Sequence, residues 1–421
     1  MEKPQESILI QNTTVLEGCE LKLLESVDIF IDGGTITDVA ESGNADYSKN
    51  GIGRVIDGRG TVVIPGFVNA HVHLNDAPLK DAGAGMTLEE MVHPVSGLKR
   101  SGMLKYSMEE RLRSVSSALA EMAQSGITGA IDFHEEDYSI IARLKASLPS
   151  ASPAVQFLGR PAVYFSEKEI VENLMLETDE IDEGRQRLEP FDGIALSGCN
   201  EYSDGAMEQI HGMAKGRMAG IHAAETIRSD RLSRKMTGES EVKRAIEHLK
   251  PDFFVHLTHA DDDDLRMISK QAIVSVICPR SNALFGAGIP PVGKLMALKI
   301  PVALGTDNLM LNSTDMFREM DFASKVADIA SGEPGTVEDV EVLKMATLNG
   351  ANLMSRGRSH GCIEAGGKAD LVVIDLKSER MEGTNDVVSA IVHRAGISDI
   401  MYTVKAGKII YERQCRGKRV E

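Results

Sequence analysis

Short apolar runs alternate with amphipathic stretches along the middle of the chain, from about residue 65 to about residue 360. The apolar runs predict eight strands, at residues 62–71, 127–133, 154–159, 191–197, 219–223, 253–258, 272–277 and 301–305. Helical periodicity fills the intervals, for example at 108–125, 206–217, 240–249 and 262–270. The acidic run 261–264 fits the first turn of the last of these helices, where the helix dipole favours negative charge. This alternation predicts an α/β fold of the (β/α)8 barrel class.

The two ends of the chain have another pattern, of short strands separated by turns. Apolar or alternating runs occur at 7–15, 27–31 and 36–39, and Asp32-Gly33-Gly34 between the last two is a hairpin signal. Residues 368–412 repeat this style. We therefore expect one small β domain built from residues 1–63 and 362–421, with the barrel formed by residues 64–361.

The first predicted barrel strand ends in two histidines, His71 and His73. Because side chains alternate faces along a strand, both imidazoles can point toward one place. In parallel barrels the carboxyl ends of the strands carry the active site. Later strands also end in polar groups: His222 followed by Glu225, then His256 or alternatively His259, and finally Asp307. One such histidine alone would usually be structural, but together these groups are costly to bury unpaired and predict a metal site.

Composition narrows the class of protein further. The 421 residues carry a net charge of -17, which disfavours binding to nucleic acid or to anionic membranes. No long apolar run is present, which predicts no membrane span, and the polar residues 1–7 lack a signal-peptide pattern, which predicts a cytoplasmic location. The five cysteines are odd in number and widely spread, so we expect reduced, mostly buried thiols without a disulfide.

Six segments carry a family resemblance: Pro65–His73, His222–Thr226, His256–His259, Cys278–Asn282, Gly305–Asn308 and Gly361–Leu371. In this order they resemble the strand 1, 5, 6, 7 and 8 motifs and the C-terminal motif of the amidohydrolase superfamily. The resemblance covers nearly the whole chain. It points to the aminohydrolase branch, which holds methylthioadenosine, adenosylhomocysteine, guanine and cytosine deaminases and triazine chlorohydrolases. It implies that the terminal β domain is a sandwich and that the protein is a homo-oligomer.

The resemblance also implies roles for individual residues. His71, His73, His222 and Asp307 would bind one divalent metal ion, His256 would lie beside the attacking water, and Glu225 would pass a proton to a ring nitrogen. Asp307 could also accept the proton of the water. Two-metal relatives need a bridging lysine or glutamate on strand 3 or 4, and no lysine ends either predicted strand, which favours a single metal. Three histidines and an aspartate suit zinc, with iron or manganese as alternatives.

The substrate is less well defined than the chemistry. Residues 74–81 lack the loop expected of a methylthioadenosine deaminase, and the chain has no tryptophan to stack on a purine. Candidate residues for binding a small heterocyclic substrate are Glu201, Tyr202, His134, Ser281 and Asn282, and less so His93 and Lys99. We expect hydrolytic deamination of a purine-type or pyrimidine-type ring with release of ammonia. The alternatives are hydrolysis of another ring substituent or amide, and a non-catalytic scaffold, which the complete set of predicted ligands disfavours.

Overall fold

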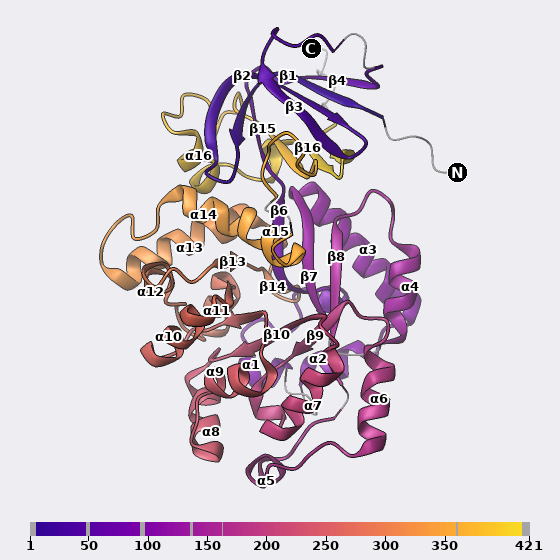
Figure 1. Cartoon of the computed structure of the whole chain (residues 1–421), viewed down its shortest axis with the longest axis vertical. Coiled ribbons are helices and arrows are strands. Elements are labelled where there is room, and N and C mark those ends of the chain that lie inside the picture. The colour runs from indigo at the N-terminus through magenta and orange to yellow at the C-terminus, as the bar shows by residue number, and fades with distance from the viewer. Residues whose placement is uncertain are drawn as a thin grey trace.

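The computed structural model describes residues 6–47, 51–92, 97–134, 138–161, 163–358 and 361–414, and contains two β-sheets. One sheet lies in the upper part of Figure 1 and combines strands from both ends of the chain. The other lies below it among helices and is built from the middle of the chain. The fold is therefore mixed α/β, with the two sheets separate.

The lower sheet contains nine parallel strands and curls round on itself. Its strands, in sheet order, are β13 (Val302–Leu304), β12 (Val274–Ile277), β11 (Phe253–His256), β10 (Met218–Ala223), β9 (Gly193–Leu196), β8 (Ala154–Gly159), β7 (Ile127–His134), β6 (Phe67–His73) and β14 (Asp307–Asn308). The two outermost strands, β13 and β14, are separated by only two residues of the chain. The predicted succession of parallel strands is confirmed. It could be predicted from the sequence because buried parallel strands read as continuous apolar runs.

Helices follow the strands, as their periodicity predicts. The longer ones are α3 (Met108–Gln124), α4 (Ser139–Ser147), α6 (Thr178–Leu188), α7 (Asp204–Ala214), α8 (Ile227–Thr237), α10 (Asp262–Gln271), α13 (Met316–Ser331), α14 (Asp339–Ala346) and α15 (Leu348–Ser355). Shorter pieces are η1 (Leu74–Leu79), α1 (Leu88–Val92), α2 (Leu98–Met103), α5 (Glu167–Val171), η2 (Cys199–Glu201), α9 (Glu241–Arg244), η3 (Ala245–Leu249), α11 (Pro279–Phe285), α12 (Val292–Ala297) and α16 (Val387–His393). Asp261 caps α10 with a capping box, so the acidic run begins that helix as predicted.

Strands from the two ends of the chain form the upper sheet. Its members are β1 (Ile8–Glu17), β2 (Lys22–Asp32), β3 (Thr35–Glu41), β4 (Arg54–Asp57), β5 (Thr61–Pro65), β15 (Leu371–Asp375), β16 (Ile400–Lys405) and β17 (Lys408–Glu412). The hairpin predicted at Asp32-Gly33-Gly34 joins β2 to β3. β5 pairs antiparallel with β15 and joins the two terminal segments. The single strand predicted at 62–71 is wrong: the chain breaks it at Gly66, giving β5 to this sheet and β6 to the other.

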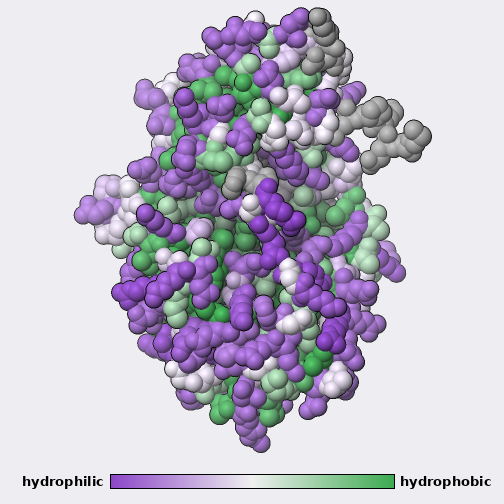
Figure 2. All heavy atoms as spheres, in the orientation of Figure 1, coloured by the Kyte–Doolittle hydropathy of each residue, from purple (hydrophilic) through white to green (hydrophobic). Residues whose placement is uncertain are grey.

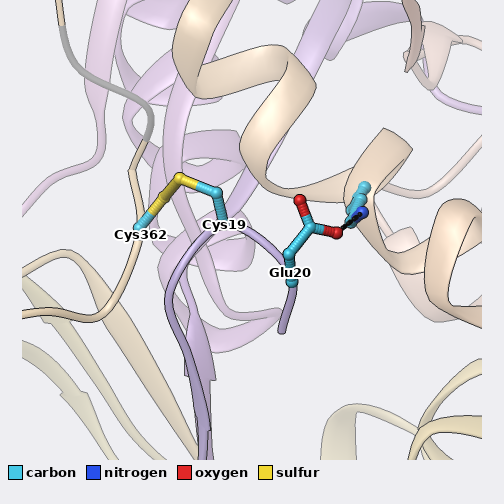
Figure 3. The surroundings of a disulfide bond; sticks show 4 residues. Cys19, Glu20 and Cys362 are labelled. Carbon is cyan, nitrogen blue, oxygen red and sulfur yellow. Dashed lines mark hydrogen bonds and ion pairs between the residues drawn. A yellow bond between two sulfur atoms is a disulfide. The ribbon is translucent and has the colours of Figure 1, made fainter. Parts of the chain in front are cut away.

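The expectation of reduced cysteines is wrong for one pair, because Cys19 and Cys362 form a disulfide (Figure 3). The turn after β1 lies beside the segment that enters the C-terminal strands, and Gly18 N donates to Ile363 O at 3.0 Å. This contact brings the two cysteine Cα atoms within 5.3 Å despite a separation of 343 residues. The salt bridge between Glu20 and Lys344, 3.0 Å long, lies next to the disulfide. Cys199 and Cys278 are free and buried, as expected, and Cys415 lies outside the described residues.

Hydrophilic side chains cover most of the face shown in Figure 2, with smaller apolar areas between them. Among the residues that the structure describes, none of the helices has the length and apolar character needed to cross a bilayer.

Candidate metal centre

His71 and His73 leave the carboxyl end of β6 on one face of the strand, and both approach Asp307. His71 Nε2 lies 3.2 Å from Asp307 Oδ1, and His73 Nε2 lies 3.3 Å from the same oxygen. The ring of Phe133 on β7 packs edge-on against His71, with centroids 4.5 Å apart. The predicted convergence of the two imidazoles is therefore present, and an aromatic ring supports it from the neighbouring strand.

Asp307 reaches this position because the chain between β13 and β14 passes very close to β6. A Cβ atom at Gly305 would lie 2.8 Å from both the Cβ and the carbonyl oxygen of His71, so only glycine fits there. Asn69 fixes the next residue from both sides, since its Oδ1 accepts from Thr306 N at 3.0 Å and its Nδ2 donates to Thr306 Oγ1 at 2.7 Å. Asn69 is a site residue that the sequence reasoning quoted in a motif without giving it a role.

His222 at the end of β10 and His256 at the end of β11 complete the cluster. His222 Nε2 lies 3.2 Å from His71 Nε2. One ligand atom from each of His71, His222, His256 and Asp307 lies within 4.8 Å of the others, and all four residues are buried. The predicted ligand His73 lies outside that tightest group but still contacts Asp307.

Hydrogen bonds on the far side of three rings fix how these histidines face the centre. Nδ1 of His73 donates to Phe133 O at 3.0 Å, Nδ1 of His222 donates to Leu196 O at 3.3 Å, and Nδ1 of His256 donates to Asn282 Oδ1 at 2.9 Å. With the proton assigned to Nδ1, each Nε2 carries a lone pair directed at the centre. Such outer hydrogen bonds are typical of metal-binding histidines.

The electrostatics fit a cation at the centre. Burial lowers the pKa of His71 to about 4 and holds the pKa of His222 well below its usual range, so both rings are neutral at pH 7. Burial alone would raise the pKa of Asp307, but its close contacts with the His71 and His73 rings outweigh it and hold that pKa well below its usual range. Several lone pairs and one carboxylate thus converge in a buried space, which is the donor set of a transition-metal site.

Glu225 lies beside this cluster, two residues beyond β10. Its Oε1 is 3.6 Å from His256 Nε2, and its side chain is partly exposed. The sequence placed Glu225 near His222 by spacing alone, and the structure brings it to the His256 side of the centre. A carboxylate in this position can exchange protons with a molecule bound over the metal ligands.

Two predicted substrate-binding residues contact the candidate ligands themselves. Ser281 Oγ donates to Asp307 Oδ2, and Asn282 accepts from His256 as described above. Asn282 Nδ2 in turn donates to Thr258 Oγ1 at 2.7 Å, which fixes the orientation of the amide. These contacts favour a positioning role for both residues, and their contact with substrate stays a prediction.

The other predicted substrate-binding residues lie away from these ligand contacts. His134 is buried, with Nδ1 3.3 Å from Asp132 Oδ2, and it follows Phe133 on β7. Glu201 in η2 lies 3.6 Å from Arg160 Nη1, while the Tyr202 side chain is buried in the main hydrophobic core. Lys99 in α2 forms a buried 3.0 Å salt bridge with Asp76, and His93 lies outside the described residues. Substrate contact by these residues also stays a prediction.

Sequence reasoning missed two buried carboxylates close to the site. Glu241 in α9 accepts a hydrogen bond from Ala224 N at 2.9 Å, next to Glu225. Glu319 in α13 lies 3.2 Å from Nη1 of Arg280, the residue that precedes Ser281 in the chain. Burial raises the pKa of Glu241 to about 7 and that of Glu319 to about 8. Neither lies at a strand end, so the pattern that found the other site residues gave no signal for them.

Comparisons with known proteins identify the family of this chain. The family described as Amidohydrolase family matches residues 62–411. A protein of Methanothermobacter thermautotrophicus, provisionally named an aminohydrolase, is 31% identical over 405 residues, covering 96% of this chain and 99% of that protein. A 5-methylthioadenosine/S-adenosylhomocysteine deaminase of Thermoanaerobacter pseudethanolicus is 29% identical over 433 residues, covering 96% of this chain and 94% of that protein.

Solved structures give the same fold. The crystal structure of an adenosine deaminase from Xanthomonas campestris with bound zinc superposes with a TM-score of 0.80 at 21% identity, covering 97% of this chain and 93% of that chain. The family match spans most of the sequence and includes every strand that carries a candidate ligand. The chain belongs to the amidohydrolase family.

Proposed function

We propose that this protein is a metal-dependent hydrolase that removes an amino group from an aminated heterocycle and releases ammonia. The observation that carries the proposal is the buried convergence of His71, His222, His256 and Asp307 with Glu225 beside them. The named deaminase relatives, which align over nearly the whole chain, support this reaction type. The curled sheet is then a (β/α)8 barrel over residues 64–361, with β13 and β14 as two halves of its eighth strand. Residues 1–63 and 362–421 form the β-sandwich domain.

In this proposal His71, His73, His222 and Asp307 hold one divalent metal ion, most simply zinc. A metal ion so bound supplies Lewis-acid chemistry and lowers the pKa of a water molecule toward about 7. Neither β8 nor β9 contains a lysine that could bridge a second ion, so one metal per chain is proposed. Iron or manganese would suit the same ligands less specifically.

The remaining site residues would transfer protons and orient the attacking water. Asp307 carries Ser281 on its second oxygen and can take the proton of the attacking water. His256, fixed by Asn282, orients the water from the other side. Glu225 then delivers a proton to the ring nitrogen next to the carbon under attack, which makes that carbon a better electrophile. Collapse of the adduct breaks the C–N bond: the amino group takes the proton held by Asp307 and leaves as ammonia, while the hydroxyl proton of the adduct returns to Glu225.

Two measurements test the proposal. Purified protein should contain about one transition metal per chain by elemental analysis, and His73→Ala should lose it, whereas His256→Asn should keep most of it. Close to two metals per chain would contradict the single-metal site. Metal retained by His73→Ala but lost by His256→Asn would exchange the roles of the two histidines.

A coupled ammonia-release screen over aminated purines, pyrimidines, pterins and triazines should identify a substrate. The same panel should include chlorinated triazines, because release of chloride without ammonia would favour the alternative hydrolysis of another ring substituent. Metal-loaded protein that turns over none of these compounds would contradict the deaminase proposal.

Assembly and location are also proposals. A homo-oligomer would give a particle mass well above 45.6 kDa by light scattering at micromolar concentration, and a monomer would contradict it. A cytoplasmic location stays a prediction, and the Cys19–Cys362 disulfide weighs against it because disulfides are rare in reducing compartments. Cell fractionation followed by alkylation of free thiols tests both points together.

A further inference from the structure

The turn that carries Glu225 has a strained backbone that needs support. Ala224, between β10 and Glu225, has a φ of 49°, in the left-handed region that residues other than glycine rarely adopt. Both polar groups of its backbone are fixed by other segments. Ala224 N donates to Glu241 Oε2 at 2.9 Å, and Ala224 O accepts from His259 N at 2.8 Å.

The Glu241 carboxylate also ties this turn to two other segments. It is buried, and its Oε2 accepts a second hydrogen bond from Ser229 Oγ at 2.9 Å, at the start of α8. Its Oε1 accepts from Asn200 Nδ2 at 3.0 Å, in η2 beyond the end of β9. Asn200 Nδ2 also donates to Ser229 O at 2.8 Å, which closes the network. The ends of β9 and β10 and the first turn of α8 are therefore held by one side chain.

A carboxylate is an expensive group to place here. Burial raises the pKa of Glu241 to about 7, and the negative charges of Asp230 and Glu225 add to the shift. An apolar side chain would avoid this cost but would leave Ala224 N–H without an acceptor in a buried position. The buried Glu241 carboxylate therefore serves as the acceptor that the Ala224 N–H requires.

We propose that Glu241 is a positioning residue that holds the Glu225 turn so that the Glu225 carboxylate stays beside His256. This inference rests on the proposed function, in which Glu225 transfers the proton. It extends the site to a residue that lies on no strand and touches no candidate metal ligand. Glu241 acts through the backbone of Ala224 and never reaches the substrate.

The test compares two substitutions of Glu241 in metal-loaded protein. Glu241→Gln keeps an oxygen for Ala224 N and Ser229 Oγ and gives up only the bond from Asn200. Glu241→Met keeps the length of the side chain but removes every acceptor. We expect Glu241→Met to lower kcat by about 10-fold to 100-fold with a smaller change in KM, because small misplacement of a catalytic group has effects of this size. For Glu241→Gln, kcat should stay within about 5-fold of wild type, because the retained oxygen keeps Ala224 and therefore Glu225 in place.

Asp28 in β2 offers a matched control far from the site. Like Glu241, it is a buried carboxylate that accepts one backbone N–H, from Asn12 at 2.8 Å, and one serine hydroxyl, from Ser42 at 2.6 Å. Asp28→Leu should lower the thermal midpoint as Glu241→Met does but leave kcat unchanged. Equal loss of kcat in both variants would overturn the inference, because it would mean that general destabilisation explains the effect.

A double-mutant cycle separates positioning from structure. In a Glu225→Gln background, Glu241→Met should cause no further loss of kcat, because the group it positions no longer transfers a proton. The same fold loss in both backgrounds would overturn the inference.

Hydrogen exchange distinguishes a failure here from a failure of the proposed function. Even if no substrate is found, Glu241→Met should speed exchange in a peptide covering residues 222–229, and Glu241→Gln and Asp28→Leu should not. Unchanged exchange in Glu241→Met would overturn the inference whatever the reaction is.

Discussion

We predict that the Cys19–Cys362 disulfide makes a large and measurable contribution to stability. It closes a loop of 343 residues, and the chain-entropy relation gives a stabilisation of about 6 kcal/mol at 25 °C for a loop of that length. A 421-residue chain has an unfolding entropy of roughly 0.9 kcal/mol per kelvin. Dividing the first value by the second predicts that loss of the disulfide lowers the thermal midpoint by about 7 °C.

The assay compares three samples by scanning calorimetry at one scan rate: oxidised wild type, wild type in reductant, and the double variant Cys19→Ser with Cys362→Ser. The second and third samples should melt at the same temperature, below the first. The double variant should not respond to reductant, because the two other cysteines that the structure describes, Cys199 and Cys278, are free thiols. Peptide mapping without reduction should recover the peptides of Cys19 and Cys362 as one linked species. A wild-type midpoint that does not move in reductant, together with both cysteines fully alkylated in native protein, would refute the reasoning.

Three further predictions concern the site. Gly305→Ala should lose most of its bound metal, since the new Cβ would lie 2.8 Å from the His71 carbonyl oxygen; metal content near wild type would contradict the close approach of the two strands. Glu225→Gln should keep metal and thermal midpoint but lose about 10²–10⁴-fold in kcat, the usual contribution of a general acid or base, and near-normal turnover would exclude its proton-transfer role. Glu319→Gln should change the pH dependence of stability, measured by denaturant unfolding, by removing one component that falls with pH. Burial raises the pKa of Glu319 from 4.5 to about 8, so the native state keeps a proton that the unfolded chain releases, and the contribution of Glu319 to stability falls as pH rises from about 4.5 to about 8. A slope that does not change in the variant would show that Glu319 does not titrate in this range.

Strands and candidate ligands could be predicted from the sequence because both depend on local pattern. Buried parallel strands read as apolar runs, and their polar end residues stand out against those runs. The break at Gly66 could not be predicted in this way, since β5 and β6 are both fully buried and the apolar run 62–68 passes through it without a polar residue. The Cys19–Cys362 pairing depends on two turns that meet only in the folded chain. Glu241 reads as an ordinary acidic residue in the first turn of a helix, and its second role depends on where Ala224 lies.

The left-handed backbone conformations at the strand ends could not be predicted from the sequence for a related reason. Ala224, His256, Leu257 and Asp307 all have positive φ values, of 49°, 76°, 52° and 58°. None of them is glycine, so the sequence gives no turn signal at these positions. A left-handed backbone costs such residues roughly 1–2 kcal/mol each. Hydrogen bonds between strands compensate for the strain, for example from Leu257 N to Ala223 O at 3.1 Å. The strain is local, but its compensation comes from distant residues, as is common at functional sites.

The balance between backbone strain and its compensating contacts can be tested at Ala224. Its side chain belongs to the hydrophobic core rather than to the candidate metal ligands. Ala224→Gly relieves roughly 1–2 kcal/mol of left-handed strain. The greater freedom of glycine in the unfolded chain costs about 0.5–1 kcal/mol and the loss of the buried methyl group about 0.8 kcal/mol, so the opposing effects nearly cancel. The thermal midpoint should therefore change little. The turn, however, loses the rigidity that fixes Glu225, so kcat should fall while bound metal stays at the wild-type level. A variant with unchanged kcat would mean that the corner at Ala224 contributes only to the fold and that Glu225 is held by the contacts of its side chain instead.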